Sequence, residues 1–154
     1  AFVNKAQAAA AKFVVAVPSG RIGLSIYDRY ATRSRTRATR WSGYGLFSAP
    51  GWPGLTLLGE VGFGTDDLGN GMRHNLAATF VEADYRVNRA VLLRVKYDFS
   101  DVIRGVAGNA SERYVVESDL TLVPFADLKL GYRTIVSERS SNEYQLIGMV
   151  HLYY

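Results

Sequence analysis

The sequence predicts an all-β chain of antiparallel strands, and three observations carry this prediction. Apolar and polar side chains alternate in one run after another, which is the period of a strand with two different faces. Turn-forming residues separate these runs, as at Asn88-Arg89 and at Pro124–Asp127. No run approaches the roughly 18 consecutive apolar residues of a helical membrane span. The nearest, residues 6–17, is interrupted by Lys12.

The N-terminal part of the chain is the less regular one. Residues 1–19 remain undecided, because Ala6–Lys12 favours helix by propensity whereas Phe13–Val17 favours strand. We therefore treat residues 1–19 as a separate segment and residues 20–154 as one β domain. Three strands are expected in its first part, at residues 21–31, 39–48 and 55–64, where glycines 59, 62 and 64 indicate bends or close packing.

The C-terminal part alternates most clearly. Strands are predicted at residues 75–87, 91–99, 113–123 and 128–136, and a last one runs to the end of the chain. Each is close to the roughly 9–11 residues of a tilted membrane-spanning strand. Together these runs predict about eight strands in an antiparallel, up-and-down arrangement.

Charged residues occupy the face of these strands opposite the apolar one. In the strand at residues 91–99, Leu93 and Val95 alternate with Arg94 and Lys96. Unpaired charge in a low-dielectric interior is costly, and the side chains of a closed eight-strand barrel just fill its interior. Balanced charge therefore favours a filled barrel over a water-filled pore, which stays as the alternative. The network predicted inside comprises Glu82, Asp84, Arg86, Arg94, Lys96, Asp98, Glu117, Asp119, Lys129 and Arg133.

The last strand ends on an aromatic residue in an apolar, period-two face. That face consists of Tyr144, Leu146, Val150, Leu152 and Tyr154, with Gly148 between them. The pattern resembles the C-terminal signature of Gram-negative outer-membrane β-barrels. The resemblance implies a transmembrane β-barrel in the outer membrane, in contact with membrane lipids and, during biogenesis, with the barrel-assembly machinery. The first residues show no leader, so we expect a mature or truncated form, or the C-terminal part of a larger barrel.

A second resemblance concerns two hairpins. The hairpin from Val87 to Phe99 and the strand pair around Val123-Pro124-Phe125 are similar to large porin-like barrels associated with multihaem cytochromes. This resemblance implies a sheath or scaffold for a periplasmic or haem-bearing protein. The chain contains no cysteine, so it has no Cys-x-x-Cys-His of its own, no thiolate metal site and no expected cofactor.

Basic residues gather before residue 41. The net charge is +4, and counting turns back from a periplasmic C-terminus places the connection near residues 32–38 on the outer side, where longer loops belong. No stacking platform or glycine-rich phosphate loop accompanies the cluster, so nucleic acid is not an expected partner. Lipopolysaccharide and other phosphate-bearing headgroups are the predicted contacts, with a solvated strand rim as the alternative. The cluster consists of Arg33, Arg35, Arg37 and Arg40.

Catalytic patterns are sparse. His74 and His151 are the only histidines, and no serine–histidine motif of lipid-modifying barrels is present, although Ser111, Ser140, Ser141 and Glu138 lie in or beside predicted outer loops. We therefore predict a structural, porin-like or scaffold barrel without chemistry of its own. The alternatives are a sheath around a multihaem cytochrome and a lipid A-modifying enzyme. A soluble lipocalin-like barrel would reverse the two faces.

Overall fold

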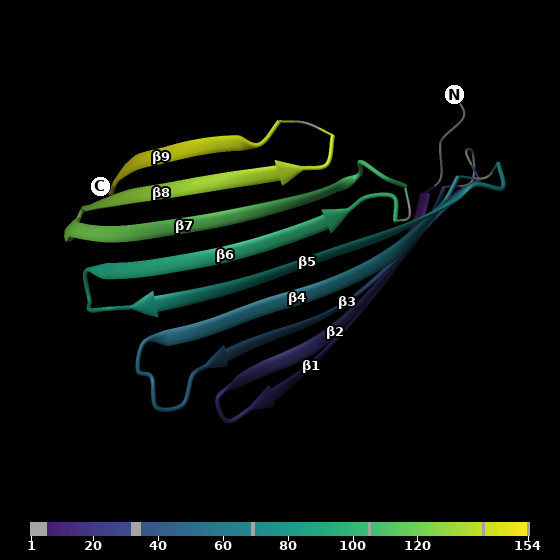
Figure 1. Cartoon of the computed structure of the whole chain (residues 1–154). Helices are drawn as coiled ribbons and strands as arrows, with labels where there is room; N and C mark the ends of the chain where they lie inside the picture. Colours follow the sequence, from purple (N-terminus) through teal and green to yellow (C-terminus); the bar gives the residue numbers. More distant parts are fainter. Residues whose placement is uncertain (1–5, 32–34, 69, 105, 140, 154) are drawn as a thin grey trace.

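The computed structural model is one antiparallel sheet of nine strands (Figure 1). It describes residues 6–31, 35–68, 70–104, 106–139 and 141–153. Each strand pairs with its neighbours in sequence, so the predicted all-β, up-and-down arrangement is confirmed. No helix in the described ranges is long and apolar enough to cross a membrane. The strands are β1 (Ala6–Val17), β2 (Gly20–Ala31), β3 (Thr36–Ser48), β4 (Leu55–Asp67), β5 (Arg73–Arg86), β6 (Val91–Asp101), β7 (Ala110–Val123), β8 (Ala126–Ser137) and β9 (Glu143–Leu152).

The structure has one strand more than the eight predicted from residue 21 onward. β1 occupies most of the segment that the sequence left undecided, and it pairs with β2 without interruption from Ala6–Ala31 to Val17–Gly20. Alanine has the highest intrinsic helix propensity, but such propensities are small per residue, and a full ladder of interstrand hydrogen bonds overrides them here. Two other strands are also longer than predicted. β4 continues to Asp67 instead of ending at residue 64, and β5 begins at Arg73 instead of residue 75.

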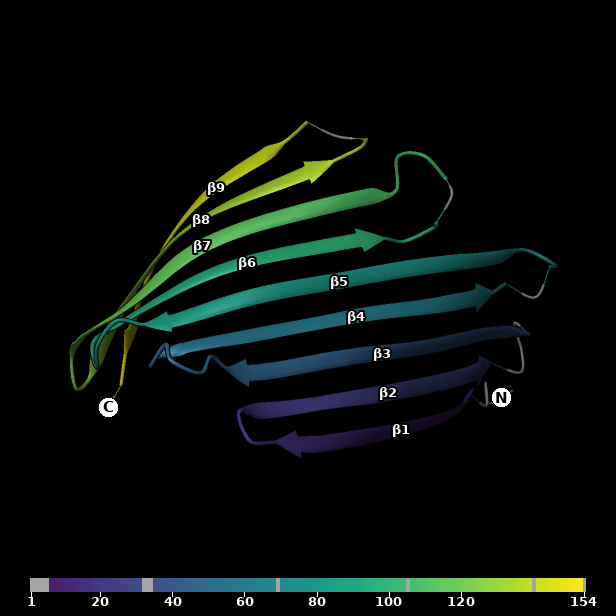
Figure 2. The same cartoon turned by 60° about the horizontal axis from the view of Figure 1, so that its bottom comes forward.

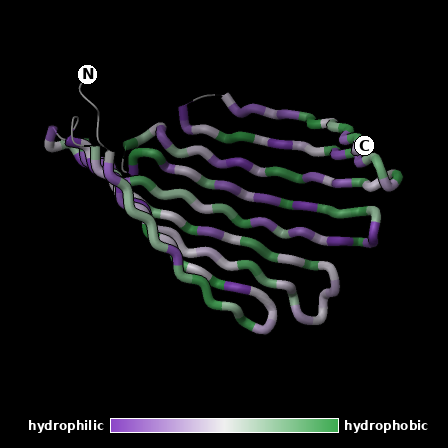
Figure 3. Tube along the Cα trace, turned by 180° about the vertical axis from the view of Figure 1, so that it is seen from behind, coloured by the Kyte–Doolittle hydropathy of each residue, from purple (hydrophilic) through white to green (hydrophobic). Residues whose placement is uncertain are grey.

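The register keeps each face continuous from strand to strand. On one face Ile26 lies opposite Trp41, which lies opposite Phe63. On the other, Arg94 lies between Asp84 and Glu117. Because side chains alternate with period two, a slip by one residue would exchange the faces. Figure 3 shows hydrophilic and hydrophobic residues interspersed along the strands.

The charged face is the concave one. The side chains of Arg94 and Lys96 are 24% and 27% exposed, whereas their neighbours Leu93 and Val95 on the other face are 42% and 56% exposed as whole residues. The sheet is curved, as Figures 1 and 2 show. The lower exposure of the longer, charged side chains places them on the inner side of this curve. A hollow of about 440 Å³ on this face extends across β4 to β8. The sheet remains open, with β1 and β9 at its two margins.

The chain builds almost no apolar core of its own. Among the described residues the buried hydrophobic ones are Ala31, Val115 and Ala126. The accessible surface is 10913 Å², whereas the general scaling for folded soluble monomers gives about 7,700 Å² at this mass. The apolar face is therefore left to be covered by something other than this sheet.

Candidate functional site in the charged concave face

Arg94 on β6 is the centre of the largest group of charges. Its Nε lies 2.8 Å from an oxygen of Asp84 and 3.3 Å from one of Glu82, both on β5. On the other side its NH1 lies 3.4 Å from Glu117 and 4.0 Å from Asp119, both on β7. One guanidinium thus faces four carboxylates from the two neighbouring strands.

The strand register explains this geometry. Asp84, Arg94 and Glu117 are direct partners across three strands, while Glu82 and Asp119 occupy diagonal positions. Lys129 on β8 adds a second cation, with its Nζ 3.0 Å from Glu117. The Glu117 side chain is only 10% exposed, so the two cations compensate a carboxylate that is largely removed from water. We call these six residues the Arg94 cluster.

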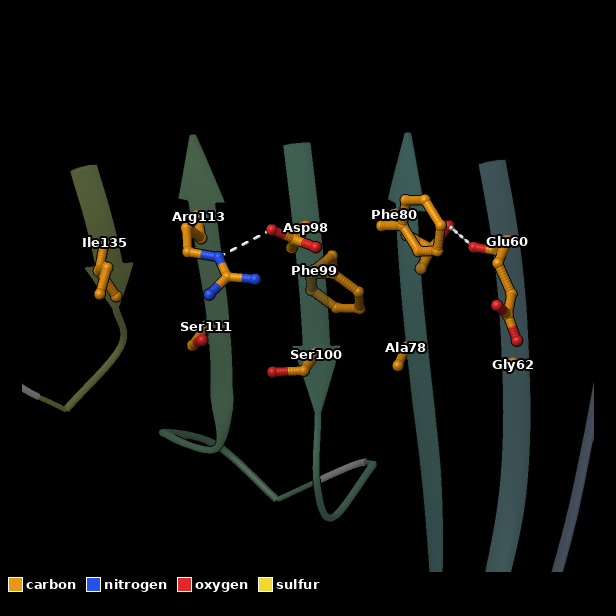
Figure 4. A pocket seen from close by; sticks show the side chains of 11 residues that line it. Glu60, Gly62, Ala78, Phe80, Asp98, Phe99, Ser100, Ser111, Arg113 and Ile135 are labelled. Carbon is orange, nitrogen blue, oxygen red and sulfur yellow. Dashed lines mark hydrogen bonds and ion pairs between the residues drawn. The ribbon is translucent and has the colours of Figure 1, made fainter. Parts of the chain in front are cut away.

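A second, smaller group lies on the same face, toward the end of β6 and the start of β7. The Nε of Arg113 is 2.7 Å from Asp98, and Nζ of Lys96 is 3.3 Å from the same carboxylate. The ammonium of Lys96 also lies 5.0 Å from the ring centre of Phe80. Arg113 and Asp98 border the hollow, together with Ser100 and Ser111 (Figure 4). This arrangement binds the strands to one another and leaves polar groups facing the hollow.

Eight of the ten residues predicted as an interior network take part in these groups. Arg86 is exposed at the end of β5 and forms no ion pair with a described residue. Arg133 instead donates to the side-chain oxygen of Gln145 at 3.5 Å, and its Nε is buried without a hydrogen-bond partner. Arg113, which was not among the ten predicted residues, joins the second group through its ion pair with Asp98. The cation–π contact of Lys12 with Tyr44, 4.7 Å from the ring centre, was not predicted.

The predicted arginine cluster at the outer rim is partly engaged within the protein. Arg37 donates two hydrogen bonds to Asp28, at 2.9 and 3.1 Å. Arg40 lies 2.6 Å from Asp66 and donates to two backbone carbonyls. Arg35 is exposed in a turn with a φ of 52°. Arg33 lies outside the described residues.

Asp28 lies just beyond the apolar part of β2, and its carboxylate accepts hydrogen bonds from two neighbouring side chains. The hydrogen bonds from Arg37, together with one from Thr39 at 2.8 Å, hold the pKa of the Asp28 carboxyl below its ordinary value. At neutral pH the Arg37–Asp28 pair is therefore fully charged and carries no net charge. The rim is less basic than the sequence suggested.

The C-terminal residues keep the predicted faces. Tyr144, Leu146, Val150 and Leu152 are all exposed on the apolar face, and Leu146 reaches 87% exposure. Tyr154 lies outside the described residues. The Tyr153 hydroxyl donates to the Asp127 carboxylate, which is on the concave side.

The two histidines lie at opposite ends of the sheet. His74 lies opposite Asp66 near the start of β5, and His151 lies opposite Asp127 beside the turn between β7 and β8. Glu138 accepts a hydrogen bond from the backbone of Gly108. Ser140 is not among the described residues. No group of three or more His, Asp or Glu side chains in the described ranges is arranged to hold a metal ion.

The chain matches no protein-family model, no curated protein and no solved structure. What the fold and the site define is a curved antiparallel sheet with an apolar convex face and a charge-paired concave face.

Proposed function

We propose that this chain is an integral outer-membrane β-barrel protein of a Gram-negative bacterium, with a structural, porin-like or scaffold role and no chemistry of its own. The observation that carries the proposal is the exposed apolar convex face. A sheet that hides charges on its inner side and presents Leu, Val and aromatic side chains outward has the polarity of a membrane barrel and the reverse of a soluble one.

The apolar face has the dimensions of a membrane band. On β4 it runs from Leu55 to Phe63, which is about 26 Å along the strand and about 20 Å along the normal of a tilted barrel. At its outer edge Trp41 and Phe63 stack with ring centres 4.7 Å apart. The next layer on the same face is polar: Asp28, Thr39, Thr65 and Asn75 lie opposite one another across four strands. Aromatic residues at such a boundary are typical of membrane proteins.

The Arg94 cluster supports a filled interior rather than a selective pore. Each of its four carboxylates lies within 4.0 Å of a cation on a neighbouring strand, and these carboxylate side chains are 10–35% exposed. A network held this closely contributes to the stability of the barrel and orders its strands. The outer rim, where Arg35 is exposed and the exposed Arg37 is paired with Asp28, is the part of the chain that we propose to contact lipopolysaccharide.

A sheath around a periplasmic or haem-bearing protein is the second candidate, and one observation favours it. The concave side of β2 to β5 carries small residues such as Ser25, Ser42, Gly62 and Ala78 around a hollow of about 240 Å³. Small side chains leave room for a partner to approach the sheet closely.

Membrane fractionation of cells expressing the chain tests the main proposal. We expect recovery in the outer-membrane fraction, resistance to carbonate extraction, and a heat-dependent shift in migration in detergent gels. Recovery as a water-soluble monomer without detergent would overturn the proposal. Co-purification of a haem-bearing protein would favour the sheath over the simple structural role.

A further inference from the structure

The two edge strands of the sheet, β1 and β9, each lack a hydrogen-bonding partner on one side in the part of the chain that the structure describes. Both have features that favour pairing with a further strand. β1 has β2 as its one neighbour and β9 has β8 as its one neighbour among the described residues. Each edge therefore presents a row of backbone N–H and C=O groups along 12 residues in β1 and 10 residues in β9.

Neither edge carries the devices that protect exposed edges from pairing. Soluble proteins shield such edges with proline, bulges, several lysines or very short strands. β1 has Lys12 as its single charge, β9 has Glu143 at its very start, and neither contains proline. Both pair with their inner neighbours without a register shift. The edges are long, regular and free to accept a partner.

The strand count decides which partner fits. Consecutive strands are antiparallel, and nine is odd, so β1 and β9 run in the same direction. Closing the sheet on itself would make a parallel seam, whereas transmembrane barrels of bacteria are antiparallel and have even numbers of strands. Leaving the edges open inside a bilayer is also costly, because no water is present to satisfy their backbone groups.

We propose that β1 and β9 are docking edges for an odd number of additional transmembrane β-strands, which run antiparallel to both and complete the barrel. The inference rests on the proposed membrane location. The partner strands must be apolar on the face that continues Phe13 and Val15 on β1 and Leu146 and Val150 on β9. On the other face they must be polar or small.

A second copy of the chain does not meet these requirements. Two copies related by an axis along the barrel would pair β9 with β1 in parallel. Two copies related by a perpendicular axis would pair antiparallel, but they would place the polar rim of Asp28 and Thr39 on opposite sides of the membrane. The occupant is therefore a different strand segment.

Disulfide cross-linking tests the arrangement, because the chain has no cysteine of its own. Each double-cysteine variant combines one position on β1 with one on β9, all on the concave face. The positions are Ala8, Ala10 or Lys12 on β1 and Gln145, Ile147 or Met149 on β9. Oxidation is carried out in outer membranes from cells that express the variants. We expect none of these pairs to close on oxidation. The control pair Ala10→Cys with Tyr27→Cys, direct partners in β1 and β2, should close and shift in a non-reducing gel.

A photo-cross-linking residue at Ala10 or Ile147, which lie on the concave face away from the lipid, then identifies the neighbour by mass spectrometry. We expect adducts with a peptide of alternating polarity from outside residues 1–154. A β1–β9 disulfide, adducts with lipid alone, or cross-links between two copies would overturn the proposal. Heat-dependent migration of each variant is measured in parallel. A variant series without this shift contradicts the proposed membrane location. A series that shows the shift but gives one of the contrary cross-links contradicts only the proposed pairing of the edges.

Discussion

Arg94 and Glu117 face each other across β6 and β7 at 3.4 Å, and Glu117 is shared with Lys129 at 3.0 Å. These two ion pairs join β6, β7 and β8 on the concave face. The partners of Arg94 on β5 add a fourth strand. The register that makes the apolar face continuous is thus the same register that brings these charges together.

Removing the central guanidinium should destabilise the protein. Arg94→Gln leaves four carboxylates without their shared cation, and we expect a loss of about 3–5 kcal/mol in the free energy of unfolding if the interior excludes water. Reversible unfolding in lipid vesicles measures it. The matched control is Arg86→Gln, an exposed arginine without an ion pair, which should change stability by less than about 0.5 kcal/mol. Equal, small effects would indicate a water-filled interior and favour a conduit.

A charge on the convex face should be costly in a bilayer. Val95 is 56% exposed on the apolar face near the middle of β6, and Val95→Arg should cost about 2–4 kcal/mol near the bilayer midplane. The control is Lys96→Arg, which keeps the charge on the concave face and should be nearly neutral. Unfolding in vesicles compares the two, and a tolerated Val95→Arg would contradict the assignment of the faces.

Two glycines of the sheet should respond oppositely to alanine. A Cβ at Gly20 would collide with the backbone carbonyl of Leu46, whereas a Cβ at Gly148 would meet nothing within 4 Å. We expect Gly20→Ala to cost about 1–3 kcal/mol, as overpacking does, and Gly148→Ala to be neutral or slightly stabilising. Urea denaturation of the vesicle-embedded protein checks both. The prediction fails if Gly20→Ala is as stable as Gly148→Ala.

The terminal aromatic residue should matter for assembly. Deleting Tyr154, or replacing it with a charged residue, should lower the yield of folded protein in the outer membrane more than the same replacement at Tyr153. Tyr153 donates to Asp127 on the concave side, so its loss removes one polar contact and leaves the apolar face unchanged. Quantifying heat-modifiable protein in membrane fractions measures the difference. Equal tolerance of both changes would contradict an assembly role for Tyr154.

The sequence by itself determined the strands and their faces. Period-two alternation is a local property, so Leu93 and Val95 could be assigned to one face and Arg94 and Lys96 to the other without any knowledge of pairing. The strands from β2 onward, and the opposite placement of charged and apolar side chains, follow from that pattern alone. Residues 6–17 were undecided because their local propensities conflict, and only pairing with β2 made them a strand.

The tertiary structure decided which charges meet. Alternation places ten charged residues on one face, but the register between strands selects Asp84 and Glu117 as partners of Arg94 and leaves Arg86 outside. It also pairs Arg37 with Asp28 and Arg40 with Asp66, which a count of arginines along the chain misses. Register, curvature and the open edges depend on hydrogen bonds between residues far apart in sequence, and no local pattern contains that information.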